Sequence, residues 1–98
     1  MHTIRRAPEF DVWLASLKDE STRMRLVARL RKAQLGNMGD IKPLGACVYE
    51  MREHFGPGWR MYYLKMDLVL IVMLGGGDKA SQVRDIEKAM ELAKQIEI

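Results

Sequence analysis

Apolar residues near the start of the chain recur at the spacing of an amphipathic helix. Residues 8–20 place apolar side chains at positions i, i+3, i+4 and i+7, which lie on one side of a helix. These residues are Phe10, Trp13, Leu14 and Leu17. Pro8 suits the first turn, because its missing N–H would have no partner within the helix. The pattern predicts a helix here, and residues 2–7 before it suit a short strand.

A second helix is predicted over residues 22–36, with Gly36 ending it and Asp19 or Ser21 capping its start. Its predicted apolar positions are Met24, Val27, Leu30 and Leu35. Three basic residues share the spacing i, i+4, i+7 and therefore form one flank of the helix. They are Arg25, Arg29 and Lys32. Two interpretations stay open: the flank is solvated, or it contacts RNA or a partner protein.

From residue 40 the pattern becomes that of β-strands separated by turns. Three strands are predicted, over residues 48–55, 59–66 and 68–74, after a Gly/Pro-rich connection with a short extended piece. The third strand is apolar without alternation, which is typical of a central strand covered on both faces. Residues 81–98 return to helical spacing. The expected fold class is α+β: an N-terminal strand and a helical hairpin packed on a twisted antiparallel sheet of four to five strands, with a C-terminal helix.

Composition agrees with one globular domain spanning residues 1–98. The chain is 48% hydrophobic and 30% charged, which excludes a disordered chain. The single Cys47 can form neither an intramolecular disulfide nor a Cys-rich zinc site. The longest apolar run, residues 68–74, is far shorter than the about 20 residues that cross a bilayer, and no signal peptide is expected. We therefore expect a cytoplasmic protein.

Positive charge is concentrated in the first part of the chain. Residues 1–39 carry eight Lys or Arg against four Asp or Glu, whereas the net charge of the whole chain is only +3. Such an asymmetry favours contact with a polyanion or with an acidic protein.

The first two predicted strands form a hairpin whose side chains can be assigned to two faces. If the Gly-Pro-Gly segment between them is a three-residue loop, His54 opposes Arg60. Arg52 then opposes Tyr62, and alternation places all four residues on one face. Two arginines so close together repel each other, so a bound phosphate would be a natural complement. The alternative is a solvated outer face on which Arg52 pairs with Glu50.

The segment GGGDKAS after the last strand supplies a further positive charge, Lys79. A glycine run lets the backbone turn sharply, so Lys79 can reach the face of Arg52 and Arg60. The same segment fails as a nucleotide-binding P-loop. Asp78 separates the last glycine from the lysine, and Ala80 stands where that motif needs Ser or Thr. The sequence therefore predicts a phosphate site that is not a nucleotide loop.

Three segments carry a family resemblance. They are GNMGDIKPLG (residues 36–45), VYEMREHFGPGWRMYY (residues 48–63) and LGGGDKASQVRDIEKA (residues 74–89). With the order of predicted elements, they resemble the RelE/ParE toxin superfamily, and within it the HigB-like addiction-module killer proteins. The resemblance covers nearly the whole chain and implies a RelE-like fold and a cytoplasmic toxin of a type II toxin-antitoxin system. It also implies a cognate antitoxin, expected to be of the helix-turn-helix type, that neutralises the toxin in a hetero-oligomer.

By the same resemblance, the protein is expected to be an endoribonuclease (mRNA interferase) that cleaves mRNA on the ribosome without a metal or another cofactor. A ribose 2′-OH would attack the adjacent phosphate while cations stabilise the growing charge. Matching positions assign these phosphate contacts to Arg52, Arg60 and Lys79. RelE-type nucleases often carry Tyr or His at the start of the last helix, where this sequence has QVRD. The general base is therefore open among His54, Tyr62 and Asp85.

Two alternatives remain within the same superfamily. A ParE-like toxin would inhibit gyrase by protein contact, without nuclease chemistry and without needing the three cations together. A degenerate relative would bind antitoxin and operator DNA but would not be toxic. None of these alternatives involves a membrane partner.

Overall fold

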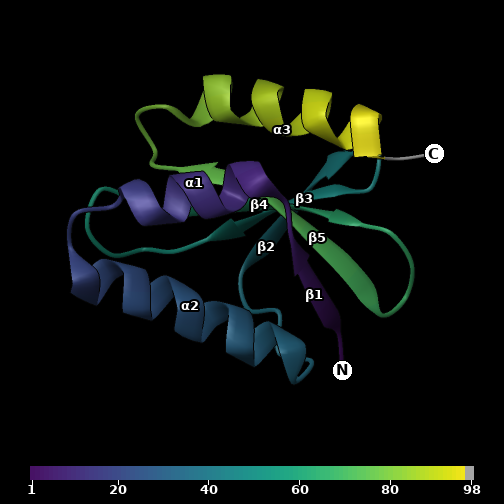
Figure 1. The fold of residues 1–98 in the computed structure, drawn as a ribbon, viewed down its shortest axis with the longest axis horizontal. Helices are drawn as coiled ribbons and strands as arrows, with labels where there is room; N and C mark the ends of the chain where they lie inside the picture. Colours follow the sequence, from purple (N-terminus) through teal and green to yellow (C-terminus); the bar gives the residue numbers. More distant parts are fainter. Residues whose placement is uncertain (97–98) are drawn as a thin grey trace.

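The part of the chain that the structure describes, residues 1–96 of a computed structural model, contains eight helices and strands. They are β1 (Thr3–Arg6), α1 (Pro8–Ser16), α2 (Glu20–Gln34), β2 (Ile41–Gly45), β3 (Val48–Arg52), β4 (Arg60–Lys65), β5 (Leu70–Gly77) and α3 (Gln82–Ile96). Figure 1 shows their arrangement. Within these residues, no helix is both long and apolar enough to cross a bilayer.

The five described strands form one sheet in the order β1-β5-β4-β3-β2. Strands β2 to β5 pair antiparallel, as the sequence predicted. β1 instead pairs parallel with β5, from Thr3 beside Leu70 to Arg6 beside Met73, so the sheet is mixed. The spacing of apolar residues within β1 does not indicate whether a strand far away in the sequence pairs with it parallel or antiparallel. The predicted α+β class, the strand number and the C-terminal helix are confirmed, with this change in one pairing.

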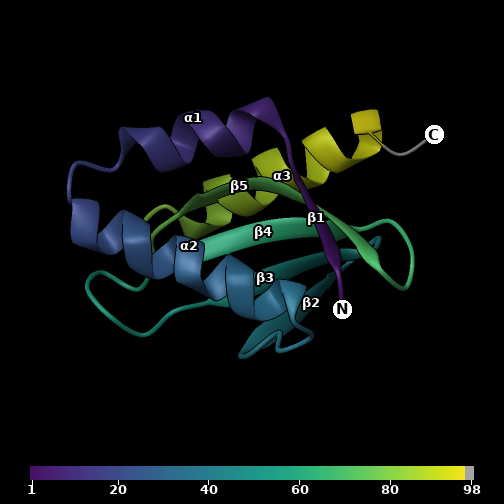
Figure 2. The same cartoon turned by 60° about the horizontal axis from the view of Figure 1, so that its bottom comes forward.

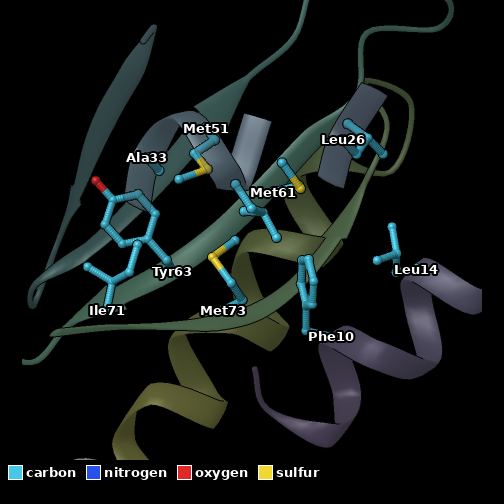
Figure 3. Close-up of a cluster of buried hydrophobic side chains, with 10 residues drawn as sticks. Phe10, Leu14, Leu26, Ala33, Met51, Met61, Tyr63, Ile71 and Met73 are labelled. Atoms are coloured by element: carbon cyan, nitrogen blue, oxygen red, sulfur yellow. The ribbon is translucent and has the colours of Figure 1, made fainter. Parts of the chain in front are cut away.

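Helices cover both faces of the sheet. Figures 1 and 2 show α2 on one side of the sheet and α3 on the opposite side. The core under α1 and α2 (Figure 3) includes Phe10, Leu14, Leu26, Met61 and Met73. The core under α3 includes Val48, Tyr62, Leu64, Leu74, Ala89 and Ala93. The molecule therefore has three layers, with the sheet in the middle.

β5 is the central apolar strand that the sequence predicted. Its most buried side chains are Ile71, Met73 and Leu74. The strand continues through the glycine run as far as Gly77, so the glycines do not make the sharp turn expected from the sequence. They allow close packing instead: a Cβ on Gly76 would lie 2.5 Å from the Trp13 ring, and one on Gly77 would overlap the Asp85 carboxylate.

α2 buries part of the predicted apolar set: Leu30 is in the core and Val27 packs against it, as predicted. Its buried residues are Thr22, Leu26, Arg29, Leu30 and Ala33. Met24 and Leu35, which were predicted to be buried, are 64% and 74% exposed. Arg29, predicted on an outward flank that contacts solvent, RNA or a partner, is buried instead, although arginine is usually exposed. The ends of the helix agree with the sequence: Asp19 is the N-cap, and Gly36 follows the last turn with a φ of 99°.

β3 and β4 pair two residues away from the predicted register. Arg52 lies opposite Arg60, not opposite Tyr62. Tyr62 lies opposite Glu50. The shift equals one full side-chain period, so Arg52, Arg60 and Tyr62 still share one face, as predicted.

The hairpin loop is longer than the predicted three residues, which explains the register. The loop comprises residues 54–58. It contains a turn in which the Gly58 N–H donates to the Phe55 carbonyl at 3.1 Å. Gly56 and Gly58 both have positive φ, of 57° and 82°, a conformation that glycine adopts without strain. His54 therefore lies in the loop and not on the strand face, where it was predicted.

Candidate phosphate-binding site

Three basic side chains from different segments meet at one end of the sheet. Arg52 ends β3, Arg60 begins β4, and the two residues are paired across the hairpin. Lys79, in the loop before α3, packs against the hairpin loop. A Cβ on Gly58 would lie 3.3 Å from Lys79 Cβ and 3.6 Å from Arg60 Nη1. The structure thus brings together Arg52, Arg60 and Lys79, here named the cationic cluster.

Arg60 is the buried member of the cationic cluster, with only 6% of the residue exposed. Its Nη1 donates to the backbone carbonyls of Glu53 and Trp59, each at 3.1 Å. These bonds fix the guanidinium group at the base of the hairpin loop. Arg52 is half-buried and Lys79 is exposed, so an anion has access to the cluster from solvent.

A fully buried carboxylate, Glu50, lies on the same face. Its Oε2 accepts a hydrogen bond from Gln82 Nε2 at 2.8 Å, which joins β3 to the first turn of α3. The alternative of a solvated face with an Arg52–Glu50 pair is wrong, because α3 covers Glu50. Arg52 Nε instead lies 3.5 Å from Asp40 Oδ2. Strand alternation predicts that Glu50 shares the face of Arg52, but the local sequence pattern does not indicate that Glu50 is buried.

Tyr62 is on the same face, in surroundings that raise the pKa of its hydroxyl. The residue is fully buried. Burial and the nearby Glu50 charge raise the pKa of its hydroxyl, and Asp85 acts in the same direction. A catalytic Tyr62 required the arginines to lower this pKa, and the opposing influence of Arg60 is smaller than that of burial. The direction of this pKa shift disfavours Tyr62 among the three candidate bases.

His54 pairs with Asp40 beside the cationic cluster. His54 Nε2 lies 2.7 Å from Asp40 Oδ2, the same oxygen that is 3.5 Å from Arg52 Nε. The hydrogen bond with His54, together with the Arg52 charge, holds the pKa of Asp40 below its usual value. The His54 side chain is 65% exposed, so its ring is accessible to a ligand. This pair provides an acid–base group next to the Arg52 cation.

Asp85, the third candidate base, lies on α3 above the end of β5. Its carboxylate accepts a hydrogen bond from Ser81 Oγ and packs against Gly77, which is paired with Arg60 in the sheet. Asp85 is thus close to the cluster but already bonded within its own helical turn. Among residues 1–96, no three His, Cys, Asp or Glu side chains gather where they could hold a metal ion.

The predicted basic flank of α2 is not a single surface. Arg29 is buried and turned inward, so its prediction as an RNA or partner contact was wrong. Its guanidinium partners are the carbonyls of Met38, Asp40 and Arg52 and the carboxylate of Glu53. Arg25 stacks on Phe55 of the hairpin loop, 3.6 Å from the ring centroid, and Lys32 is exposed. Contacts of Arg25 and Lys32 with RNA or a partner stay predictions.

These features define a class of protein: an α+β fold with helices on both faces of a mixed sheet and a cationic cluster at one end. An "Uncharacterized protein" of Haemophilus influenzae is 39% identical to the chain over 87 residues, which cover 89% of this chain and 88% of the relative. The chain therefore belongs to the same family as this Haemophilus protein. No protein-family model matches the sequence, and no solved structure matches it.

Proposed function

We propose that this protein is the toxin of a type II toxin-antitoxin system, similar to the HigB-like members of the RelE/ParE superfamily. Its proposed activity is metal-independent cleavage of mRNA on the ribosome. The observation that carries this proposal is the meeting of Arg52, Arg60 and Lys79 at one end of the sheet. Preorganised cations stabilise a phosphate whose negative charge grows in the transition state.

In the proposed reaction, a ribose 2′-OH attacks the adjacent phosphate and the 5′-oxygen of the next nucleotide leaves. His54 accepts the 2′-OH proton on Nδ1 while Asp40 holds its Nε2. Arg52 and Arg60 stabilise the phosphorane, and the exposed Lys79 donates to the leaving oxygen. The products are a 2′,3′-cyclic phosphate and a free 5′-hydroxyl.

The proposed partners are mRNA, the ribosome and a cognate helix-turn-helix antitoxin that forms a hetero-oligomer with the toxin in the cytoplasm. A groove of about 380 Å³ between α1 and α2 supports an acidic protein partner. Its lining combines apolar side chains with charges of both signs: Arg6, Arg23 and Arg31 against Asp11 and Glu20, with Arg6 already paired to Asp11. An antitoxin segment with apolar side chains and an acidic residue placed near Arg23 and Arg31 would complement this lining.

Induced expression without the antitoxin tests the proposal. Growth should stop, and primer extension should show new cuts in mRNA. Arg60→Ala should slow cleavage by roughly 10²- to 10³-fold, because it removes a fixed donor to the transition state. Lys94→Ala, which changes an exposed lysine at the far end of α3, serves as the control and should keep wild-type toxicity. Circular dichroism should show that both variants are folded.

Other outcomes would separate the alternatives. Arrested growth with a DNA-damage response and intact mRNA would indicate a ParE-like gyrase inhibitor. Unaffected growth would indicate a non-toxic relative. Full toxicity of Arg60→Ala would contradict the candidate site.

A further inference from the structure

A buried carboxylate stands directly behind Arg60. Glu50 Oε1 lies 4.0 Å from Arg60 Nε, and only 1% and 8% of the two side chains are exposed. Within the described part of the chain, neither of these facing atoms has a hydrogen-bond partner. The other carboxylate oxygen is held by Gln82. The charges are thus enclosed together but do not touch.

Such a pair is an inefficient way to stabilise a fold. Buried charges lose their hydration, and a buried polar atom without a partner leaves that loss uncompensated. Replacing a buried ion pair by apolar side chains of similar size often leaves the stability of a protein unchanged or increases it. The charge at Glu50 therefore calls for an explanation other than packing, and its place behind the cationic cluster supplies one.

The contacts of Arg60 leave one end of its guanidinium group free. Nη1 donates to the carbonyls of Glu53 and Trp59, and Nε faces Glu50. Nη2 has no acceptor within residues 1–96. It is not completely buried, so it reaches the surface. An anion at the cationic cluster would therefore bind Nη2. The orientation of the guanidinium plane decides whether this group points outward.

We propose that Glu50 is a positioning residue for Arg60: its carboxylate holds the guanidinium group in the orientation that presents Nη2 to a phosphate. This inference rests on the proposed function, because the phosphate is that of the RNA backbone. Gln82 fixes the carboxylate in turn, and it lies three residues after Lys79. Glu50 thus lies between the guanidinium group of Arg60 and the first turn of α3.

Glu50→Gln tests the inference, because it keeps the size of the side chain and its bond to Gln82 but removes the charge. We expect the Arg60 Nε–H resonance to shift in ¹H–¹⁵N spectra. Single-turnover cleavage of ribosome-bound mRNA should slow by about tenfold to a hundredfold. The affinity for a labelled RNA oligonucleotide should change less than the cleavage rate, since losing the oriented Nη2 contact and losing a nearby negative charge act in opposite directions. Partial unfolding would instead weaken binding and cleavage together.

The exchange Glu50→Gln with Gln82→Glu separates positioning from stability. It keeps one carboxylate, one amide and the hydrogen bond between them, but it moves the charge from β3 to α3. The urea midpoint should return toward the wild-type value, while the Arg60 resonance and the cleavage rate stay as in the single variant. If Glu50→Gln alone does not fold, the Arg60 resonance and the cleavage rate can be measured in the double variant instead.

The failures of the two proposals are distinguishable. An unchanged Arg60 resonance in Glu50→Gln would overturn the positioning role, and so would full recovery of cleavage by the exchange. Wild-type protein that neither binds nor cleaves RNA would overturn the proposed function. In that case the spectra would still decide whether Glu50 orients Arg60.

Discussion

Arg29 is a basic residue whose contacts are internal. From α2, its guanidinium group donates to backbone carbonyls just before β2 and at the end of β3. These belong to Met38, Asp40 and Arg52, and the Glu53 carboxylate supplies the opposite charge. Arg29 therefore fixes the backbone of Asp40 and Arg52, which carry two side chains of the candidate site.

Replacing Arg29 should destabilise the protein strongly. Arg29→Met leaves three carbonyls and a carboxylate without their donor, so the free energy of unfolding should fall by about 3 kcal/mol. Lys32→Met changes an exposed residue of the same helix and should alter it by less than about 0.5 kcal/mol. Urea unfolding followed by circular dichroism measures both. Equal midpoints would show that the internal bonds of Arg29 add little to stability.

Tyr62 leads to a prediction at alkaline pH. Burial, with the Glu50 charge as the next cause, raises the pKa of its hydroxyl above the ordinary value of 10.0. Above that pH the unfolded chain ionises Tyr62 while the folded chain keeps it neutral. The associated stability is therefore complete below about pH 10 and is lost as the pH rises.

Tyr62→Phe removes this titration, so its urea midpoint should fall less than that of the wild type between about pH 8 and about pH 11. Parallel decreases in the two proteins would show that Tyr62 ionises normally in the folded state. At neutral pH the same variant should keep its cleavage activity, because His54 and not Tyr62 accepts the proton in the proposed reaction.

The glycine run at the end of β5 lets helices approach both faces of the sheet. Gly76 lies beneath the Trp13 ring of α1, and Gly77 lies beneath the Asp85 carboxylate of α3. Gly75 has no atom within 4 Å of the position that its Cβ would take. An added methyl group would therefore meet neighbouring atoms at Gly76 and Gly77 but not at Gly75.

Alanine substitutions along this run should separate packing from backbone effects. Gly76→Ala and Gly77→Ala should each destabilise the protein by about 1–3 kcal/mol, because the added methyl group meets a packed neighbour. Gly75→Ala should be neutral or stabilising by up to about 1 kcal/mol, since it only restricts the unfolded chain. Urea unfolding measures all three. Equal losses would mean that strand conformation, and not helix packing, requires the glycines.

Local spacing predicted the helices and strands because it depends only on neighbouring residues. The face shared by Arg52 and Arg60 was also predicted, since the register error equalled one full side-chain period. The hairpin loop was misjudged because its length depends on how two glycines turn, which alternation does not encode. The parallel pairing of β1 depends on contacts across most of the chain.

The candidate site was predicted in part for the same reason. Arg52, Arg60 and Lys79 were identified from face and position, and the structure brings them together. Arg29 was predicted on an outward flank, and Glu50 was placed on a solvated face only in the alternative interpretation, because charged residues are usually exposed. Their burial depends on partners from distant segments, and no pattern within one helix or strand reveals such partners.

The whole molecule exposes its cationic cluster at the end of a sheet that helices cover on both faces. Binding of single-stranded RNA should therefore depend on salt according to the number of phosphates that this end neutralises. Each such contact contributes a slope of about −0.7 to a plot of log affinity against log salt concentration. Contacts with Arg52, Arg60 and Lys79 together predict a slope of about −2.

Lys79 is the member of the cluster that tests this count most cleanly, because it is exposed and its loss leaves no buried group without a partner. Lys79→Ala should reduce the slope by about 0.7 and weaken binding to a similar extent for every RNA sequence. Fluorescence anisotropy with a labelled oligonucleotide at several salt concentrations measures the slope, and Lys94→Ala should leave it unchanged. An unaltered slope in Lys79→Ala would place the RNA backbone away from Lys79. It would then contradict the part of the proposed reaction in which Lys79 meets the leaving oxygen.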